Sequence, residues 1–414
     1  MKDYKVQGLR TKFPALHHIL DNARTPIYLD GAGGSQVPQS VIDAMSTTMQ
    51  LGLSNLGGYF NASCVVGGIV DDARQHAADL LNAPNKDCIV FGANMTTITQ
   101  YMSWMIAAEW QAGDEIILSD LDHGANRSFW EIQAELKGVT VRYIPVTPDA
   151  CELDMAVFER LISEKTVFVA VTAASNLTGS IVDVEAIVSG AKAVGATSYI
   201  DAVHLVPHKR VDVIKLQADY VVCSAYKFFG PHVGILYGRE EALASLVPNK
   251  VTPAPSAPPR CFETGTPNIP CLAGVTASIQ HIASLTGEDS IFSDDLAGGY
   301  LAIQTHESAL LQHFKHNIAS IKGLRLLGHS SDSGNRHTPT FALSFYKHHA
   351  SDIAKYLGEH DIYSWNGHLY ADRLTRALDL DQQGGALRLS LMHYNTLEEI
   401  DKVCCLLESK LLNK

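Results

Sequence analysis

Residues 220–238 read YVVCSAYKFFGPHVGILYG, and this stretch decides the fold class. It holds two short apolar runs, Tyr220–Ser224 and Val233–Tyr237, and Lys227 lies between them with aromatic residues on both sides. Runs that are apolar almost throughout are typical of strands buried on both faces of a sheet. Five runs of the same kind precede this stretch: Asp87–Phe91, Glu115–Ser119, Val139–Ile144, Val167–Thr172 and Ser198–Asp201.

Segments with helical periodicity alternate with these apolar runs over the part of the chain from Ile27 to Gly238. Alternation of strands and helices predicts an α/β fold in which helices cover both faces of the sheet. The expected helices are Gln39–Leu51, Ile69–Leu81, Thr97–Trp110, Arg127–Leu136, Met155–Ile162 and Val184–Val194.

The chain changes character after this region. Five prolines between Pro248 and Arg260 exclude a helix or an interior strand there and predict a surface crossing or an active-site loop. A long helical pattern then runs from about Ser284 to Ile321, and strand and helix signals alternate in the remainder. We therefore expect a large α/β domain at 27–283 and a small α+β domain formed by 1–26 with 284–414.

Composition excludes several classes of partner. The 414 residues carry a formal net charge of −12, so no global basic surface attracts nucleic acid or anionic lipid. The eight cysteines include no CxxC pair, which disfavours a zinc or redox site. No apolar stretch reaches the ~20 residues that a membrane span needs, and the first twenty residues do not resemble a secretory signal. We expect a cytoplasmic protein.

Two residues next to predicted strands suggest catalysis. Burial lowers the pKa of a lysine, so a desolvated Lys227 can form a Schiff base with an aldehyde cofactor or a carbonyl substrate. The alternative is a surface lysine after an edge strand. Asp201 ends another strand, where a buried carboxylate can pair with a protonated pyridine nitrogen. The alternative is an aspartate that caps the next helix.

Polar residues follow other predicted strands as well. His123 can stack on a flat cofactor or move a proton, and Asn176 can contact a ring hydroxyl. Asp120, Asp122 and His123 could instead bind a metal, but no second cluster of such residues has a matching context. Residues 92–97 (GANMTT) join a strand to a helix and offer the parts of a phosphate cradle.

Taken in order, seven segments resemble the class V aminotransferase and cysteine desulfurase family. They are YLDGAGGSQVP at 28–38, DLDHGAN at 120–126, SNLTG at 175–179, DAVH at 201–204, SAYK at 224–227, ETGTPN at 263–268, and LRLS at 387–390 with YNT at 394–396. The resemblance implies pyridoxal-phosphate fold type I: a mainly parallel seven-stranded sheet in the large domain and a small α+β C-terminal domain. It also implies pyridoxal 5′-phosphate as cofactor, a small amino acid as substrate and a homodimer.

The resemblance further implies a role for each matching residue. Lys227 bonds covalently to the cofactor, Asp201 pairs with the pyridine nitrogen, and His123 stacks on the ring. The other implied contacts are His204 and Asn176 near the ring hydroxyl; Met95, Thr96, Ser224 and Tyr226 at the phosphate; Gly265 and Thr266 at the phosphate of the neighbouring subunit; and Arg388, with Ala32, at the substrate. Where the chain departs from the family pattern, Trp365, Asn366, His368 and Tyr370 suggest an aromatic, hydrogen-bonding wall over the substrate. Met95 and Tyr226 stand where threonine and histidine are usual.

One departure bears on the reaction. Similar desulfurases carry a nucleophilic cysteine on a loop before the carboxylate-binding arginine, but residues 363–371 read YSWNGHLYA here. A persulfide therefore has no obvious carrier. The open alternatives are aminotransferase, lyase acting on C–S or C–Se bonds, or epimerase; cysteine desulfurase or selenocysteine lyase that works without a loop cysteine; and a catalytically silent protein that binds a metabolite or a partner chain.

Overall fold

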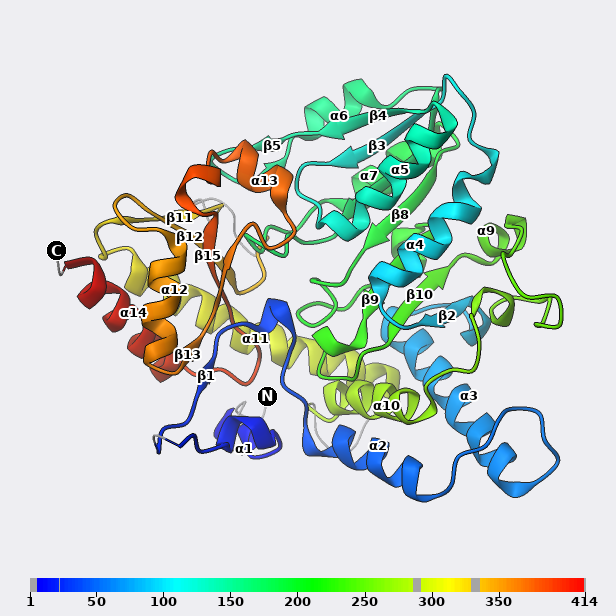
Figure 1. Cartoon of the computed structure of the whole chain (residues 1–414), viewed down its shortest axis with the longest axis horizontal. Coiled ribbons are helices and arrows are strands. Elements are labelled where there is room, and N and C mark those ends of the chain that lie inside the picture. Colours follow the sequence, from blue (N-terminus) through cyan, green and yellow to red (C-terminus); the bar gives the residue numbers. More distant parts are fainter. Residues whose placement is uncertain (1–5, 22, 286–291, 329–335, 413–414) are drawn as a thin grey trace.

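A seven-stranded sheet forms the centre of the larger part of the molecule (Figure 1). The computed structural model describes residues 6–21, 23–285, 292–328 and 336–412. The strand order is β2-β10-β9-β8-β7-β3-β4, and only β10 is antiparallel to its neighbours in this sheet. The strands are β2 (Ile89–Gly92), β3 (Glu115–Ser119), β4 (Thr140–Ile144), β7 (Thr166–Thr172), β8 (Thr197–Asp201), β9 (Tyr220–Ser224) and β10 (Gly234–Gly238). The prediction of an α/β fold with a mainly parallel seven-stranded sheet is confirmed.

Helices cover both faces of this sheet because successive strand residues point to opposite sides. In β7, Phe168 and Ala170 join the apolar cluster on one face, while Val169 and Val171 join the cluster on the other. The first face is covered by α4 (Met95–Ile106), α5 (Ser128–Lys137) and α9 (Glu240–Ser245), and the second by α3 (Asn61–Leu81), α6 (Met155–Leu161), α7 (Val184–Ala193), α8 (Val213–Leu216) and α10 (Ile269–Ala283).

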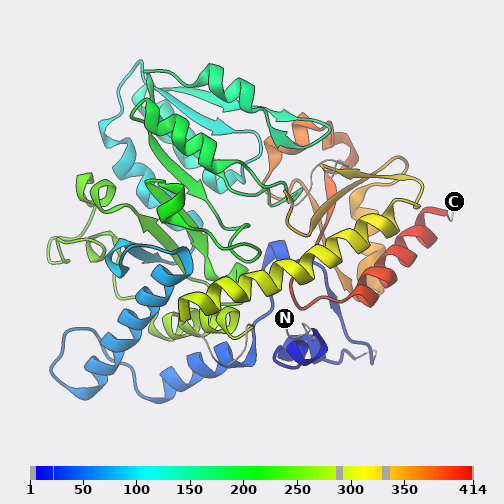
Figure 2. The ribbon, with the colours of Figure 1, turned by 180° about the vertical axis from the view of Figure 1, so that it is seen from behind.

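A second, four-stranded antiparallel sheet organises the C-terminal part. Its order is β11 (Leu324–Leu327), β12 (Thr340–Phe345), β15 (Ala386–Ser390) and β14 (Trp365–Gly367). It packs against α12 (Ala350–Glu359), α14 (Leu397–Leu412) and the end of α11 (Phe292–Ile318). Figure 2, the view from behind, shows α11 crossing in front of both parts of the molecule. The remaining helices and strands are α1 (Val6–Arg10), α2 (Gln39–Gln50), α13 (Asp372–Ala377), β1 (Ile27–Tyr28), β5 (Val146–Thr147), β6 (Glu152–Leu153) and β13 (Ile362–Tyr363).

The two parts are connected by pairing between distant segments. Strand β1 pairs in parallel with β13, and Asp30 forms a bridge with Ser390 of β15. We propose the division into domains 27–283 and 1–26 with 284–414, in which β1 and Asp30 connect the large domain to the small one. Among the described residues, no helix has the length and hydropathy needed to cross a membrane.

This arrangement positions the site. Strands β3, β7, β8 and β9 are parallel, so their carboxyl ends meet at one edge of the large sheet. Ligands of open α/β sheets bind outside that edge. Here β14 and β15 of the small sheet face it and close a cavity.

Candidate active site

A cavity of about 670 Å³ lies between the carboxyl edge of the large sheet and the small sheet. Most of the residues expected at the site line it: Lys227, Asp201, His123, His204, Asn176, Met95, Thr96, Ser224, Tyr226, Arg388, His368 and Ala32. Trp365, Asn366 and Tyr370, expected with His368 to form a wall over the substrate, line it too. The lining residues without an expected role are Gly33, Asn94, Thr172, Ala174, Val203, His232, Gly367 and Leu369.

Lys227 lies in a short turn directly after β9, so its side chain starts at the carboxyl edge of the sheet. Its Nζ donates a hydrogen bond to the carbonyl of Ala32 and lies 4.8 Å from the centre of the Tyr226 ring. Burial and the positive charge of Arg388 lower the pKa of Lys227 to about 7. A substantial fraction of this amine is therefore neutral at neutral pH, as a nucleophilic amine must be.

Asp201 ends β8 as a buried carboxyl group, 4% exposed. One of its oxygens, Oδ1, accepts a hydrogen bond from the Val203 amide at 2.9 Å. Burial raises the pKa of Asp201 to about 6, and Lys227 opposes that rise. An acid in this position gains from a cationic partner inside the cavity, because a buried carboxylate is costly without one.

His123 follows β3 and is held by its own turn. Its Nδ1 accepts a hydrogen bond from the Ala125 amide at 3.0 Å, which leaves Nε2 to carry the proton of the neutral ring. Burial and the charge of Lys227 lower the pKa of His123 to about 4. The ring is therefore neutral at neutral pH and can stack on another flat ring without bringing a charge.

The acid next to His123 has a structural role in this arrangement. Asp122 is buried, and its two oxygens accept hydrogen bonds from Ser119 Oγ at 2.5 Å and Asn126 Nδ2 at 2.8 Å. These contacts fix the turn that carries His123. Within the described ranges, no group of three His, Cys, Asp or Glu side chains has the arrangement of a metal site.

Asn176 and His204 both line the cavity but differ in their partners. Asn176 Nδ2 donates to the Leu369 carbonyl at 2.9 Å, and its buried Oδ1 has no hydrogen-bond partner among the described residues. His204 Nε2 lies 3.1 Å from the hydroxyl groups of both Thr338 and Thr340. Burial holds the pKa of His204 well below its usual range, so this ring is neutral.

The N-terminus of α4 forms another end of the cavity. Asn94 caps the helix by accepting from the Thr97 amide at 2.9 Å, and the Met95 amide donates to Ser224 Oγ at 2.9 Å. Thr96, which is exposed, lies between Met95 and Thr97 in the first turn of the helix. A helix N-terminus with hydroxyl groups is a site for phosphate.

Two aromatic rings stand beside this helix end. Tyr226 stacks on His232 with ring centres 4.7 Å apart and planes 5° apart. Both residues line the cavity, and burial raises the pKa of Tyr226, so its hydroxyl keeps its proton.

Arg388 brings a buried positive charge from the small sheet. It lies on β15, is 4% exposed, and its Nη1 donates to the Asn176 carbonyl at 2.9 Å. Burial lowers the pKa of Arg388 to about 10, so it stays protonated at neutral pH. Its Nε has no hydrogen-bond partner among the described residues. The planar guanidinium group can therefore bind a carboxylate inside the cavity.

The segment 363–371, which contains β14, forms the outer wall. Tyr370 is 68% exposed and its ring lies 5.1 Å from that of His123. Leu369 and Tyr370 both have positive φ, at 52° and 60°. The Gly124 amide holds the Tyr370 carbonyl at 2.7 Å.

Gly265 and Thr266 lie elsewhere. They line a separate cavity of about 310 Å³ with residues of β2 and α4, so the structure does not bring them to Lys227 within the chain. Their assignment to a neighbouring subunit stays a prediction.

Sequence reasoning gave no role to Asp30, which follows β1. Burial raises the pKa of Asp30 to about 6, while Arg388 and Lys227 oppose the rise. The available signal was its place directly before residues 31–34 (GAGG), in one of the segments that carry the resemblance.

The family is settled by comparison with known proteins. The model of the family described as "Aminotransferase class-V" matches residues 27–403. The chain belongs to the class V aminotransferase family. Its members use pyridoxal 5′-phosphate, and this protein is a pyridoxal-phosphate-dependent enzyme of fold type I.

Named relatives span the whole chain. The chain is 30% identical to a cysteine desulfurase of Pectobacterium atrosepticum, over 97% of this chain and 96% of that protein. It is 28% identical to a cysteine desulfurase of Dickeya dadantii over the same shares. An Escherichia coli cysteine desulfurase structure has a TM-score of 0.84 at 25% identity, covering 99% of both chains. The apo structure of a Thermococcus onnurineus cysteine desulfurase, at 24% identity, has a TM-score of 0.88 over 99% of this chain and 98% of that chain and shows the shared fold.

The residues of the cavity fit this cofactor. The buried Asn176 Oδ1 requires a hydrogen-bond donor, which the ring hydroxyl would supply. The buried Asp201 gains from a cation, which a protonated pyridine nitrogen would supply. The N-terminus of α4 suits the phosphate, and the partly neutral Lys227 suits the aldehyde.

Proposed function

We propose that the cavity binds pyridoxal phosphate through Lys227 and acts on a small α-amino acid whose carboxylate is bound by Arg388. The main observation behind this proposal is that Lys227, whose pKa is lowered, and the buried Arg388 line the same cavity as Asp201. The remaining expected contacts keep their proposed roles: His123 on the ring, His204 and Asn176 near the ring hydroxyl, Met95, Thr96, Ser224 and Tyr226 at the phosphate, and Ala32 and His368 beside the substrate.

The chain's own residues divide the work of catalysis. The bound cofactor supplies an electron sink for charge that develops at the substrate α-carbon. Asp201 stabilises the protonated ring nitrogen, and Arg388 orients the substrate by its carboxylate. Lys227 Nζ takes up or returns a proton at the α-carbon, a role that its pKa of about 7 suits.

We further infer that the reaction does not pass sulfur through a cysteine of this chain. All eight cysteines are among the described residues, and none of them lines the cavity. Cys223 is the cysteine directly before Ser224, and burial raises the pKa of its thiol far above the usual range. The thiolate that carries out sulfur transfer is therefore not available there.

A panel of amino acids tests this proposal. The purified enzyme should show a visible absorption band from the bond between Lys227 and the cofactor, and one or more small amino acids should shift the band. After incubation with L-cysteine, alkylation and mass analysis should find no persulfide on any of the eight cysteines. A protein that stays colourless with added pyridoxal phosphate would support the catalytically silent alternative, and a persulfide would contradict the inference about sulfur.

The second candidate is a lyase that cleaves the C–Se or C–S bond without an enzyme thiol. The relatives named cysteine desulfurase favour it. Selenium leaves without an attacking thiolate more readily than sulfur. Alanine release from selenocysteine but not from cysteine is the result expected for selenocysteine lyase; release from both indicates a desulfurase.

We propose a homodimer in which Gly265 and Thr266 of one subunit contact the cofactor phosphate of the other. Their separation from Lys227 within the chain supports this proposal. Sedimentation should show a dimer, and a monomer that binds the cofactor fully would contradict the assignment. A cytoplasmic location remains our proposal from the sequence, and expression with a fluorescent fusion tests it.

A further inference from the structure

Two threonines from the C-terminal part of the chain hold the ring of His204. Its Nε2 lies 3.1 Å from the hydroxyl oxygen of Thr338 and 3.1 Å from that of Thr340. His204 follows β8 of the large sheet, whereas Thr340 is the first residue of β12 in the small sheet. All three side chains are buried. The ring is therefore fixed by contacts between the two parts of the molecule.

Each threonine hydroxyl has a second polar neighbour. Thr338 Oγ1 donates to the Gly179 carbonyl at 3.4 Å, and the Thr338 amide donates to the same carbonyl at 2.9 Å. Thr340 Oγ1 lies 2.7 Å from Ser390 Oγ, its partner in the ladder between β12 and β15. Both hydroxyl protons can therefore be bonded without using the ring of His204.

These contacts decide which nitrogen of His204 carries the proton. Burial holds the pKa of His204 well below its usual range, so the neutral ring has one N–H group and one nitrogen lone pair. An N–H group at Nε2 can be shared between two oxygens in a three-centre hydrogen bond. A lone pair at Nε2 would fit one hydroxyl proton and leave the other oxygen facing it without a proton between them. The Nε2–H form is therefore the one that satisfies both contacts.

The other ring nitrogen is then an acceptor. With the proton on Nε2, Nδ1 carries the lone pair. His204 lines the Lys227 cavity, and among the described residues its ring is hydrogen-bonded through Nε2. Nδ1 is not one of the enclosed polar atoms that lack a partner in the described part of the chain, so it is open to the cavity.

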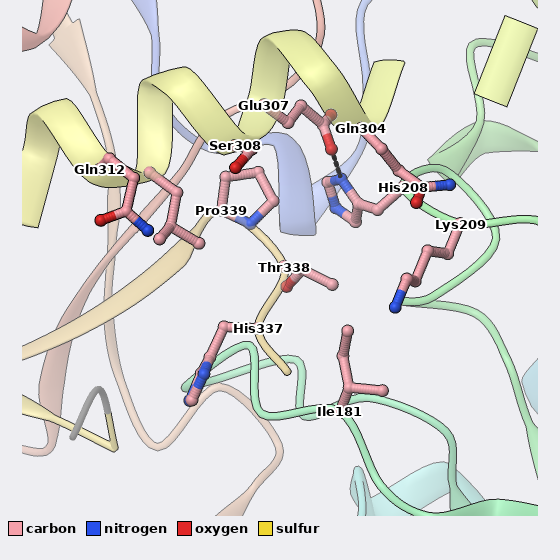
Figure 3. A pocket seen from close by; sticks show the side chains of 11 residues that line it. Ile181, His208, Lys209, Gln304, Glu307, Ser308, Gln312, His337, Thr338 and Pro339 are labelled. Carbon is pink, nitrogen blue, oxygen red and sulfur yellow. Dashed lines mark hydrogen bonds and ion pairs between the residues drawn. The ribbon is translucent and has the colours of Figure 1, made fainter. Parts of the chain in front are cut away.

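A second histidine packs against this ring. The ring of His208 meets that of His204 edge-on, with centres 5.4 Å apart and planes at 68°. Glu307 of α11 holds His208, with Oε2 2.9 Å from Nδ1. Figure 3 shows this pair and Thr338 around a small cavity of about 110 Å³ beside α11. A turn of the His204 ring would lose both threonine contacts, so the structure favours one orientation.

We propose that Thr338 and Thr340 are positioning residues that keep the proton of His204 on Nε2 and present Nδ1 to the cavity as a hydrogen-bond acceptor. Resting on the proposed function, this acceptor takes a hydrogen bond from the ring hydroxyl of pyridoxal phosphate. His204 therefore accepts at that hydroxyl and does not donate to it.

Nitrogen NMR of the full-length protein, labelled with ¹⁵N-histidine, tests this proposal because it reports the protonation of each ring nitrogen. The signals of His204 are those that disappear in His204→Gln. In cofactor-free protein we expect a protonated Nε2 and an unprotonated Nδ1. Combining Thr338→Val with Thr340→Val removes both hydroxyl acceptors with little change of shape. The population of the Nδ1–H form should then rise at least about fivefold.

Two protein controls separate this effect from a general disturbance of the core. Combining Thr338→Ser with Thr340→Ser keeps both hydroxyl groups and should keep the tautomer of the wild type. Thr375→Val removes a buried hydroxyl of α13 that donates to the Asp372 carbonyl, so the signals of His204 should not change.

Loading the wild type with pyridoxal 5′-phosphate tests the acceptor role. The Nδ1 signal should move part of the way towards the range of a protonated nitrogen, while Nε2 stays protonated. The cofactor-free spectra do not depend on cofactor binding or turnover. A protein that takes up no pyridoxal phosphate would contradict the proposed function, and the tautomer of His204 would still be decided.

Four results would overturn the proposal. They are an Nδ1–H form that dominates in the cofactor-free wild type; an unchanged tautomer in the double valine variant; a change as large in Thr375→Val as in the double valine variant; and an Nδ1 signal that does not move when the cofactor is bound.

Discussion

In the Lys227 cavity, the wall made by strand ends of the large sheet is mostly buried. The wall made by the segment 363–371 carries the exposed side chains of Trp365, His368 and Tyr370. Asp201 and His204 are each 4% exposed, but Trp365 and Tyr370 are 54% and 68% exposed. The pKa values of Lys227, Asp201 and His123 are all shifted by burial. The buried wall is therefore the one whose groups are tuned for chemistry.

The two walls are also held differently. Asp201 is fixed by the backbone ladder that joins β8 to β7 and β9. In the segment 363–371, β14 is paired with β15, but the residues after β14 are held by long-range bonds to Gly124 and Asn176. Leu369 and Tyr370, in succession, have left-handed backbone conformations, which cost of order 1–3 kcal/mol each. The end of this segment is therefore the part of the cavity wall where a change of side chain disturbs the fold least.

The largest expected effect tests the buried wall. Replacing Lys227 by Ala removes the amine that bonds the cofactor and moves the proton, so turnover of any accepted amino acid should fall at least about 10³-fold. Steady-state rates and the visible spectrum measure the change. Lys215→Ala is the matched control, since Lys215 is exposed and its ion pair with Glu185 contributes little. Turnover within tenfold of the wild type would contradict the role of Lys227.

The next effect tests the arginine that faces the buried wall from the small sheet. Arg388→Gln removes two charge-assisted hydrogen bonds to the substrate carboxylate, so kcat/KM should fall by about 10²-fold or more. Arg388→Lys keeps the charge but loses the planar fork and should recover only part of the loss.

An amine substrate without a carboxylate supplies the control for this prediction. Its residual rate, or its binding measured by the spectral shift, should differ little between the wild type and Arg388→Gln. Equal losses for the amino acid and the amine would indicate that Arg388 only supports the cavity, through its bond to the Asn176 carbonyl.

The same contrast explains what the sequence could predict. Strand β3 was predicted with its correct bounds, and Lys227, Asp201 and His123 were found because strand ends are adjacent to them in the chain. The helix α10 was not predicted. Buried apolar residues lie on several of its faces, including Leu272, Ala277 and Ile282, so its sequence shows little amphipathic period.

The place of Asp30 depends on a contact between distant segments. Asp30 forms a bridge with Ser390 of β15, so its charge interacts with that of Arg388, more than 350 residues later in the chain. No local pattern encodes this contact, whereas the ordered motifs of the family imply the cavity as a whole. His232 is different: it belongs to the stretch that decides the fold, but only the structure shows that its ring stacks on Tyr226.

A smaller effect concerns the energetic cost of the buried lysine. In cofactor-free enzyme, Lys227 has a pKa of about 7 against 10.5 when exposed, so the unfolded state binds more protons between these values. Stability from this group therefore rises with pH above about 7, by at most about 1.4 kcal/mol per pH unit. Well below pH 7 the amine is protonated in both the folded and the unfolded state, so the full free-energy cost of burying its charge is present.

Denaturant unfolding of cofactor-free protein at about pH 7 and about pH 8.5 measures this gain. Lys227→Met keeps most of the volume and should lose the rise in the free energy of unfolding. Lys215→Met, at an exposed position, should keep it. The same pH slope in the wild type and Lys227→Met would show that the amine is charged in the folded protein.

The smallest expected effect tests the segment 363–371 itself. His368 Nδ1 accepts from the Tyr370 amide at 3.0 Å, so the ring supports the left-handed turn and lines the substrate side of the cavity. Replacing His368 by Ala should change rates by less than about tenfold but unequally across a panel of small amino acids, because one lost contact alters discrimination by roughly 1 kcal/mol. The visible spectrum without substrate should stay unchanged, since the strand-end wall holds the cofactor. An unaltered kcat/KM for every amino acid in the panel would show that His368 does not select the substrate. It would contradict the assignment of substrate choice to the segment 363–371 at this residue.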